Sequence, residues 1–125
     1  MPKKILIIDD DIDLVEVLRL VLEREKLEVI DAQDGERGMK LVREEKPDLI
    51  ILDVMMSTED EGFRLAYELK KDPTTSPIPI VMLTAVTQLT GYAYDKDADA
   101  LPVEEYIEKP IMPNKLLEII HKYIA

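Results

Sequence analysis

A run of four apolar residues that ends in an aspartate, Leu49-Ile50-Ile51-Leu52-Asp53, limits the possible folds of this chain more than any other stretch. The run is too short for a helix and has no polar alternation, so it predicts a strand buried on both faces, as in a parallel sheet. Because an isolated buried charge is costly, its aspartate should lie at the strand mouth, within reach of water, a cation or a reactant. Asp53 is therefore the first candidate site residue.

Strands and helices are predicted to alternate on both sides of this run. Short apolar runs predict strands over residues 5–8, 27–32, 49–53, 78–83 and 104–108. Helical spacing predicts helices from about Asp11 to Lys26, from Asp34-Gly35 to Pro47, from Gly62 to Asp72, and across Leu116 to Ile124. One more helix is required between Val86 and Pro102, where Gly91 and several aspartates disfavour it. We expect that helix to be shortened or disordered from Thr87 to Ala100.

Five alternations of strand and helix select a parallel sheet with right-handed crossovers and helices on both faces. The simplest arrangement is an α/β, doubly wound, flavodoxin-like sandwich: a five-stranded parallel sheet of order 2-1-3-4-5 with about five helices. At 125 residues the chain has the length of one domain, residues 1–125. In this topology ligands bind at the carboxyl ends of the first and third strands, where the strand order reverses.

Charge and composition exclude several classes of partner. Acidic residues outnumber basic ones by 27 to 16, a formal net charge of −11, so we expect neither nucleic acid nor an anionic membrane as a partner. The chain has no cysteine, which excludes disulfides and thiolate chemistry. Its N-terminal Met1-Pro2-Lys3-Lys4 precedes only four apolar residues, too few for export or a membrane span, so a cytoplasmic location is expected.

Polar residues stand at the ends of four predicted strands. Asp9 and Asp10 follow the first and Asp53 ends the third. Thr84 ends the fourth and Lys109 follows the fifth. Because the carboxyl ends of parallel strands meet at one edge, these five side chains should converge. Each has a simpler explanation alone, since acids can cap a helix and a strand-end threonine or lysine can be solvated; together they favour a site.

The chemistry of these side chains favours a hard cation and a phosphoryl group. Three adjacent carboxylates repel one another unless a cation neutralises them, and oxygen ligands without cysteine or histidine favour magnesium or manganese (Mg²⁺ or Mn²⁺) over zinc. Lys109 and Thr84 would add the positive charge and the hydroxyl that an incoming tetrahedral dianion needs. Asp53 could then attack phosphorus and form a labile acyl phosphate, which suits a switch.

Four motifs in this order resemble the receiver domain of two-component response regulators over nearly the whole chain. They are Ile-Leu-Ile-Ile-Asp9-Asp10-Asp11, Leu52-Asp53-Val-Met-Met, Met-Leu-Thr84-Ala85 and Tyr106-Ile-Glu-Lys109-Pro110. The resemblance implies that Asp53 accepts a phosphoryl group from a phosphohistidine on a sensor histidine kinase or a phosphotransfer protein. It also implies a signalling domain rather than a turnover enzyme, in which phosphorylation changes a face that binds a downstream protein target.

The same resemblance implies a set of metal ligands. Mg²⁺ would be bound by Asp10, Asp53 and the backbone carbonyl of Met55, and Asp9 would help to hold it through water. The loop after Asp53 departs from the family pattern, because Ser57 stands where the family usually has proline.

The resemblance also implies how the switch responds. Lys109 would pair with a phosphoryl oxygen, Thr84 would move to hydrogen-bond it, and Tyr106 would swing inward to report the change. The approach to the fifth strand departs from the family's small-residue, Ala-Asp-Asp pattern, because this chain has Leu-Pro-Val-Glu104-Glu105.

Other functions compete with this one. A receiver-like module without phosphorylation would act by protein interaction alone. A haloacid-dehalogenase-like phosphatase needs a second aspartate two positions after its nucleophile, where this chain has Met55. A flavin binder needs free backbone donors after the first strand, whereas Asp9 to Asp11 would repel the flavin phosphate. No output domain follows Ala125, so direct DNA binding by this chain is not expected.

Overall fold

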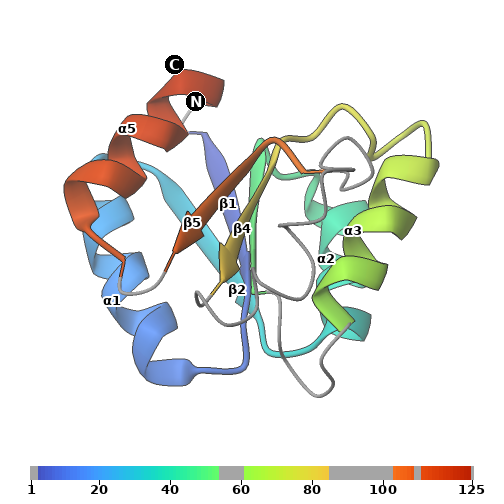
Figure 1. Cartoon of the computed structure of the whole chain (residues 1–125), viewed down its shortest axis with the longest axis horizontal. Helices are drawn as coiled ribbons and strands as arrows, with labels where there is room; N and C mark the ends of the chain where they lie inside the picture. Colours follow the sequence, from blue (N-terminus) through green and yellow to red (C-terminus); the bar gives the residue numbers. More distant parts are fainter. Residues whose placement is uncertain (1–2, 54–60, 85–102, 109–110, 125) are drawn as a thin grey trace.

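The computed structural model describes residues 3–53, 61–84, 103–108 and 111–124, which contain five strands and four helices (Figure 1). In chain order they are β1 (Lys4–Ile8), α1 (Ile12–Glu23), β2 (Glu28–Ala32), α2 (Gly35–Glu45), β3 (Leu49–Asp53), α3 (Glu61–Lys71), β4 (Ile80–Thr84), β5 (Glu105–Glu108) and α5 (Pro113–Ile124). The predicted alternation is confirmed for these segments. The weak helix expected between Val86 and Pro102 lies outside the described residues. In the described part, no helix has the length and apolar character needed to cross a membrane.

The five strands form one parallel sheet of order β2-β1-β3-β4-β5, the doubly wound order that the sequence predicts. β1 and β3 are neighbours, in a register that pairs Ile8 with Leu52. Because parallel strands run in the same direction, the residues at their carboxyl ends emerge at the same edge of the sheet. Asp9 and Asp53 therefore lie next to each other at the carboxyl edge.

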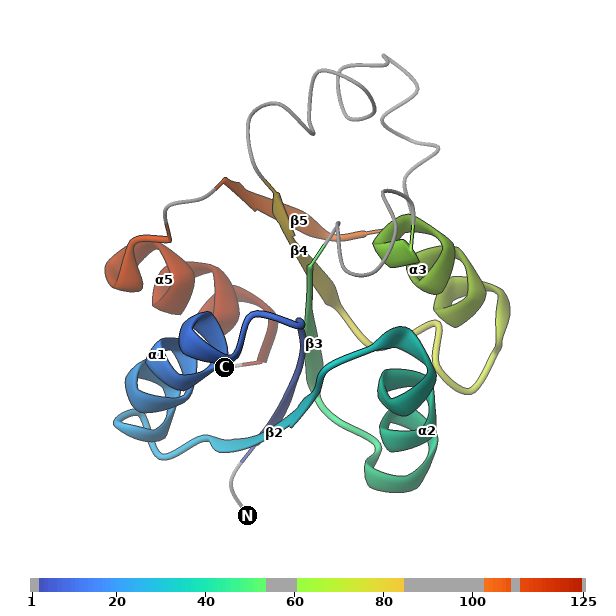
Figure 2. The ribbon, with the colours of Figure 1, turned by 90° about the horizontal axis from the view of Figure 1, so that it is seen from below.

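Helices cover both faces of the sheet (Figure 2). α1 and α5 lie on one face, where they pack against side chains such as Ile5 and Ile51. α2 and α3 lie on the other face with Leu6 and Leu52. All five residues of β3 are buried, which confirms the prediction of a strand buried on both faces. Each large aliphatic side chain buried in this way contributes about 1.5–3 kcal/mol.

Several element boundaries differ from the prediction by one to three residues, and two of them have a clear local cause. α1 ends at Glu23 rather than near Lys26, because Lys26 takes a left-handed backbone conformation (φ 62°) and its N–H donates to the Glu23 carbonyl in a tighter turn. β4 begins two residues later than predicted. The reason is that the Ile78 N–H donates to the Thr75 carbonyl in a turn, while Pro79 has no N–H to give to the sheet.

Gly38 allows α2 to pack closely on β1. A Cβ atom at this position would lie 2.6 Å from Ile8 Cδ1 and 3.2 Å from Ile8 Cγ2. Since Ile8 is fully buried, we expect Gly38→Ala to lower the free energy of unfolding by about 1–2 kcal/mol in urea denaturation, despite the helix propensity of alanine. In an Ile8→Val background, which removes Cδ1, the same substitution should cost much less. An equal cost in both backgrounds would show that this contact is not the cause.

Candidate functional site

Three carboxylates meet at the carboxyl edge of the sheet. Asp9 and Asp10 follow β1, Asp53 ends β3, and one oxygen atom from each lies within 4.8 Å of the others. Asp9 is fully buried and Asp53 is 3% exposed, whereas Asp10 is open to solvent. The cluster therefore combines two buried carboxylates with one that is accessible from solution.

The three consecutive aspartates after β1 make different local contacts. Asp9 Oδ1 accepts a hydrogen bond from the Asp11 N–H at 2.9 Å, and the Asp9 N–H donates to the Ala32 carbonyl at 3.0 Å. Asp11 is the N-cap of α1, and its Oδ1 accepts a hydrogen bond from the Leu14 N–H at 3.2 Å. The helix-capping interpretation therefore applies to Asp11, while Asp10 belongs to the carboxylate cluster.

The donor set of this cluster fits a hard divalent cation. Opposite ligands of an octahedral Mg²⁺ are about 4.2 Å apart, because each Mg–O distance is about 2.1 Å. The three carboxylate oxygens, within 4.8 Å of one another, are close to that span. Without a cation, like charges at this separation repel. Asp9, Asp10 and Asp53 could therefore hold Mg²⁺ or Mn²⁺, which oxygen ligands favour over zinc.

Three predicted site residues, Thr84, Lys109 and Met55, lie partly or wholly outside what the structure describes. Leu83 of β4 pairs with Asp53 of β3 in the sheet. The next residue, Thr84, ends β4 and pairs with Glu108 of β5. The side chain of Thr84 is outside what the structure describes. Lys109 follows β5, but Lys109 and Met55 both lie outside the described residues. Their places in the site stay predictions.

Tyr106 lies in β5, and its ring packs against the core beneath α2 and α3. Its phenolic oxygen is buried and has no hydrogen-bond partner among the described residues. Burial raises the pKa of Tyr106 to about 12, with a smaller contribution from the phenol of Tyr67. The ring thus points into the protein in this structure.

A polar contact close to Tyr106 in the sequence is not predictable from the local sequence pattern. Lys70 of α3 forms a half-buried ion pair with Glu104, the residue before β5. These residues are 34 positions apart in the sequence, so no local pattern pairs them. The two acidic residues directly before Tyr106, Glu104 and Glu105, were the available signal.

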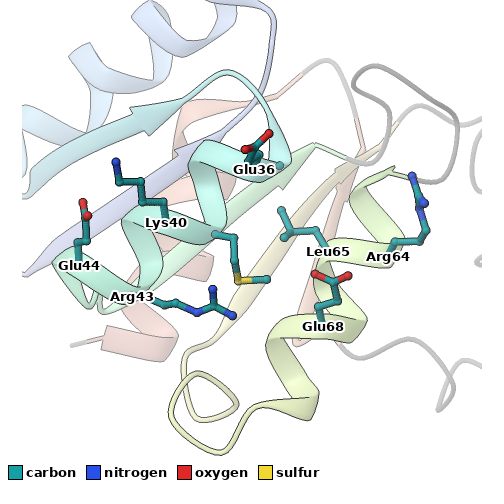
Figure 3. Close-up of a pocket in the computed structure, with 9 residues that line it drawn as sticks. Glu36, Lys40, Arg43, Glu44, Arg64, Leu65 and Glu68 are labelled. Carbon is teal, nitrogen blue, oxygen red and sulfur yellow. The ribbon is translucent and has the colours of Figure 1, made fainter.

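A hollow of about 650 Å³ between α2 and α3 lies apart from the carboxylate cluster (Figure 3). Met39 and Leu65 contribute its apolar lining, and Arg43 extends from α2 toward the α3 side of the hollow, where Glu68 lies. Three acidic and three basic side chains line it, and none of the three clustered aspartates does. The hollow therefore lacks the donor set of the carboxylate site.

Comparison with known protein families identifies the class of this protein. The family model of the response regulator receiver domain matches residues 5–121. The chain therefore belongs to the receiver domains of two-component response regulators. This finding agrees with the strand order of the sheet and with the resemblance of the four sequence motifs.

Individual relatives support the same family. Protein PilH of Pseudomonas aeruginosa is 34% identical to the chain over 122 residues, which cover 98% of each protein. The alkaline phosphatase synthesis transcriptional regulatory protein PhoP of Bacillus subtilis is 38% identical over 117 residues, which cover 93% of the chain and 46% of PhoP. The chain thus spans about half the length of such transcriptional regulators. The solved structure of chemotaxis protein CheY4 of Vibrio cholerae has a TM-score of 0.86 and 25% identity, and 99% of this chain and 100% of that chain are covered.

Removing the phenolic oxygen should have different effects at Tyr106 and Tyr123. Because the Tyr106 oxygen is buried without a partner in the described part of the chain, Tyr106→Phe should leave the free energy of unfolding unchanged or raise it by up to about 1 kcal/mol. The Tyr123 hydroxyl donates to Glu105 at 2.8 Å, so Tyr123→Phe should lower it by about 1 kcal/mol. Urea denaturation measures both, and an equal loss in the two variants would contradict this assignment.

The dependence of stability on pH checks the burial of Tyr106 independently. Because its pKa is raised on folding, the stabilisation from this residue is fully present below the ordinary tyrosine pKa of 10.0 and is lost as the pH rises through about 12. Tyr106→Phe should therefore lose less stability than the wild type over that interval. Parallel stability curves for the two proteins would mean that the phenol is not buried.

Proposed function

We propose that this chain is a phosphoacceptor signalling domain, in which Asp53 receives a phosphoryl group from the phosphohistidine of a sensor histidine kinase or a phosphotransfer protein. The observation that carries this proposal is a nearly buried carboxylate, 3% exposed, at the end of β3 within a cluster of three. An Asp53 oxygen would form a bond to phosphorus as the P–N bond breaks, and the departing imidazole would take up a proton. The phosphoryl group stays on the chain, so the domain acts as a switch rather than as a turnover enzyme.

Magnesium, or manganese, is the cofactor that we propose for this transfer. Asp10, Asp53 and the backbone carbonyl of Met55 would hold the ion, and Asp9 would contact it through water. The bound ion supplies positive charge that offsets the charge of the phosphoryl oxygens. The hydrogen bond from the Asp11 N–H to the Asp9 carboxylate supports this arrangement, because it fixes the orientation of one buried acid. The exposure of Asp10 gives a hydrated cation access to the cluster.

Lys109, Thr84 and Tyr106 would complete the switch. Lys109 would pair with a phosphoryl oxygen, Thr84 would hydrogen-bond the phosphoryl group, and the Tyr106 ring would be drawn to its inward position in response. The order of the sheet supports these roles, since β4 and β5 end at the edge where Asp53 lies. We propose that residues 1–125 act as one receiver domain whose phosphorylation alters a protein-binding face. The net charge of −11 favours a downstream protein target over nucleic acid or an anionic membrane.

Intact mass spectrometry tests the phosphorylation of Asp53. After incubation with acetyl phosphate and Mg²⁺, the wild type should gain one phosphoryl group, and EDTA should prevent this. Asp53→Asn should gain none, because an amide is not a carboxylate nucleophile. Asp11→Asn is the matched control: it removes one negative charge nearby and keeps the N-cap, so it should be phosphorylated to the same extent as the wild type.

A wild type that gains no mass under any of these conditions would contradict the proposal. The chain would then be a receiver-fold module that binds its partner without phosphorylation. That module would bind the same partner equally well with and without the Asp53→Asn substitution.

Asp10→Asn should have opposite effects on stability with and without Mg²⁺. In EDTA the substitution relieves repulsion among three carboxylates and should raise the free energy of unfolding by about 1 kcal/mol. At an Mg²⁺ concentration of about 100 Kd the wild type should gain about 2.7 kcal/mol, and the variant should gain far less. Urea denaturation in both conditions measures this. Asp13→Asn, in the first turn of α1, should keep the full gain, and an equal gain in all three proteins would place the ion elsewhere.

A further inference from the structure

Two adjacent glutamates at the start of β5 connect this strand to both helical layers. Glu104 reaches Lys70 of α3 on one face of the sheet. Glu105 reaches Lys122 and Tyr123 of α5 on the other face. These glutamates stand where the chain departs from the small-residue approach that is usual in the family. The contact between Lys70 and Glu104 is termed the α3 clamp.

The α3 clamp is part of a half-buried polar network. Lys70 Nζ lies 2.5 Å from Glu104 Oε1. The same ammonium donates to the carbonyl oxygens of Ser76 and Ile78, each at 2.9 Å, and Glu104 Oε1 accepts a hydrogen bond from the Ile80 N–H at 3.1 Å. The two charged side chains are 19% and 26% exposed, so water screens their attraction less than that of a surface pair. One ammonium group therefore joins the end of α3, the segment before β4 and the start of β5.

Glu105 is held by α5 through a separate set of side-chain contacts. Its Oε2 accepts hydrogen bonds from the Tyr123 hydroxyl at 2.8 Å and from Lys122 Nζ at 3.0 Å. These bonds lower the pKa of Glu105. Glu105 is therefore a matched comparison for Glu104, because it is the neighbouring residue with the same charge and is held by the opposite helical layer.

The α3 clamp and the Tyr106 ring contact the same region of α3. The phenols of Tyr106 and Tyr67 are close enough to interact electrostatically. Tyr67 and Lys70 are three residues apart on α3, which places them on one face of that helix. The clamp lies at the amino edge of the sheet, before β4 and β5, whereas the carboxylate cluster lies at the carboxyl edge. The clamp can therefore act on Tyr106 without touching the phosphorylation site.

We propose that Lys70 is a positioning residue for the switch: through Glu104 it fixes the start of β5 against α3 and stabilises the inward position of the Tyr106 ring, the position that phosphorylation would also favour. The inference rests on the proposed role of Tyr106 in reporting phosphorylation of Asp53. Without the clamp, the start of β5 would keep its side-chain anchor to α5 but lose the one to α3, and the ring would exchange between inward and outward positions. The clamp thus favours the inward state of the switch even without phosphorylation.

Tyrosine-ring NMR on the unphosphorylated full chain tests the clamp. With ¹³C-labelled tyrosine and assignment through Tyr106→Phe, the variants Lys70→Met and Glu104→Gln should each shift the Tyr106 ring signal. Each should also increase the broadening of that signal by a soluble paramagnetic agent, because the ring becomes accessible. The double variant should change the Tyr106 signal no further than Lys70→Met alone, because Glu104→Gln acts through the ion pair that Lys70→Met already removes. Glu104→Gln keeps the shape of the side chain, so it serves if Lys70→Met does not fold.

Two matched controls separate positioning from a general loss of stability. Lys71→Met changes the exposed neighbour of Lys70 on α3 and should leave the Tyr106 signal unchanged. Glu105→Gln removes the same charge as Glu104→Gln from the same end of β5, and it should shift the Tyr123 signal instead. A Tyr106 signal that shifts equally in the controls and in the clamp variants would indicate a merely structural role and overturn the proposal.

Measuring phosphorylation in the same variants distinguishes an error in the α3 clamp proposal from an error in the proposed phosphoacceptor function. Lys70→Met should gain a phosphoryl group from acetyl phosphate to the wild-type extent, because the clamp lies at the opposite edge of the sheet. The Tyr106 signal should change more on phosphorylation in this variant than in the wild type, because its ring starts from a less buried position. An unchanged Tyr106 signal in unphosphorylated Lys70→Met and Glu104→Gln would overturn the clamp. A wild type that is not phosphorylated would overturn the proposed function and leave the ring measurement valid.

Discussion

Burial of β3 on both faces is the constraint on which the rest of the structure depends. A strand with apolar side chains on both sides needs a covering layer on each, and here α1 and α5 cover one side while α2 and α3 cover the other. Right-handed crossovers to parallel neighbours then bring all strands to an end at the same edge. Asp53, the charged residue of this strand, avoids a purely hydrocarbon environment by lying at that edge.

Gathering three carboxylates at this edge costs electrostatic free energy, and local contacts reduce that cost. The Asp11 N–H donates to the Asp9 carboxylate, and the positive end of the α1 dipole is close in sequence. Asp10 reduces its own cost by staying in solvent. A bound cation would relieve the repulsion among the three carboxylates, and this relief would be part of its affinity. A cluster of this kind therefore lowers the stability of the metal-free domain and raises the affinity of the site for a cation.

The order of the elements could be predicted because it depends on local patterns, namely short apolar runs and helical spacing, and connection rules then gave the strand order. The meeting of three aspartates at one edge followed from that order. Other features depend on backbone geometry or distant pairing. The assignment of the cap to Asp11 needs hydrogen-bond geometry, the end of α1 depends on a left-handed Lys26 that no glycine marks, and Lys70 meets Glu104 across 34 positions.

The carboxylate cluster and the α3 clamp lie at opposite edges of the sheet, and β4 connects the two edges. In the register of the sheet, Leu83 of β4 pairs with Asp53, and its neighbour Met82 pairs with Tyr106. A displacement at the carboxyl end of β4 therefore has to cross only one strand boundary to reach Tyr106. If β5 were free at both ends, the whole strand would slide in response to such a displacement. Because Glu104 holds the amino end of β5, the displacement would instead change the position of Tyr106 within the strand.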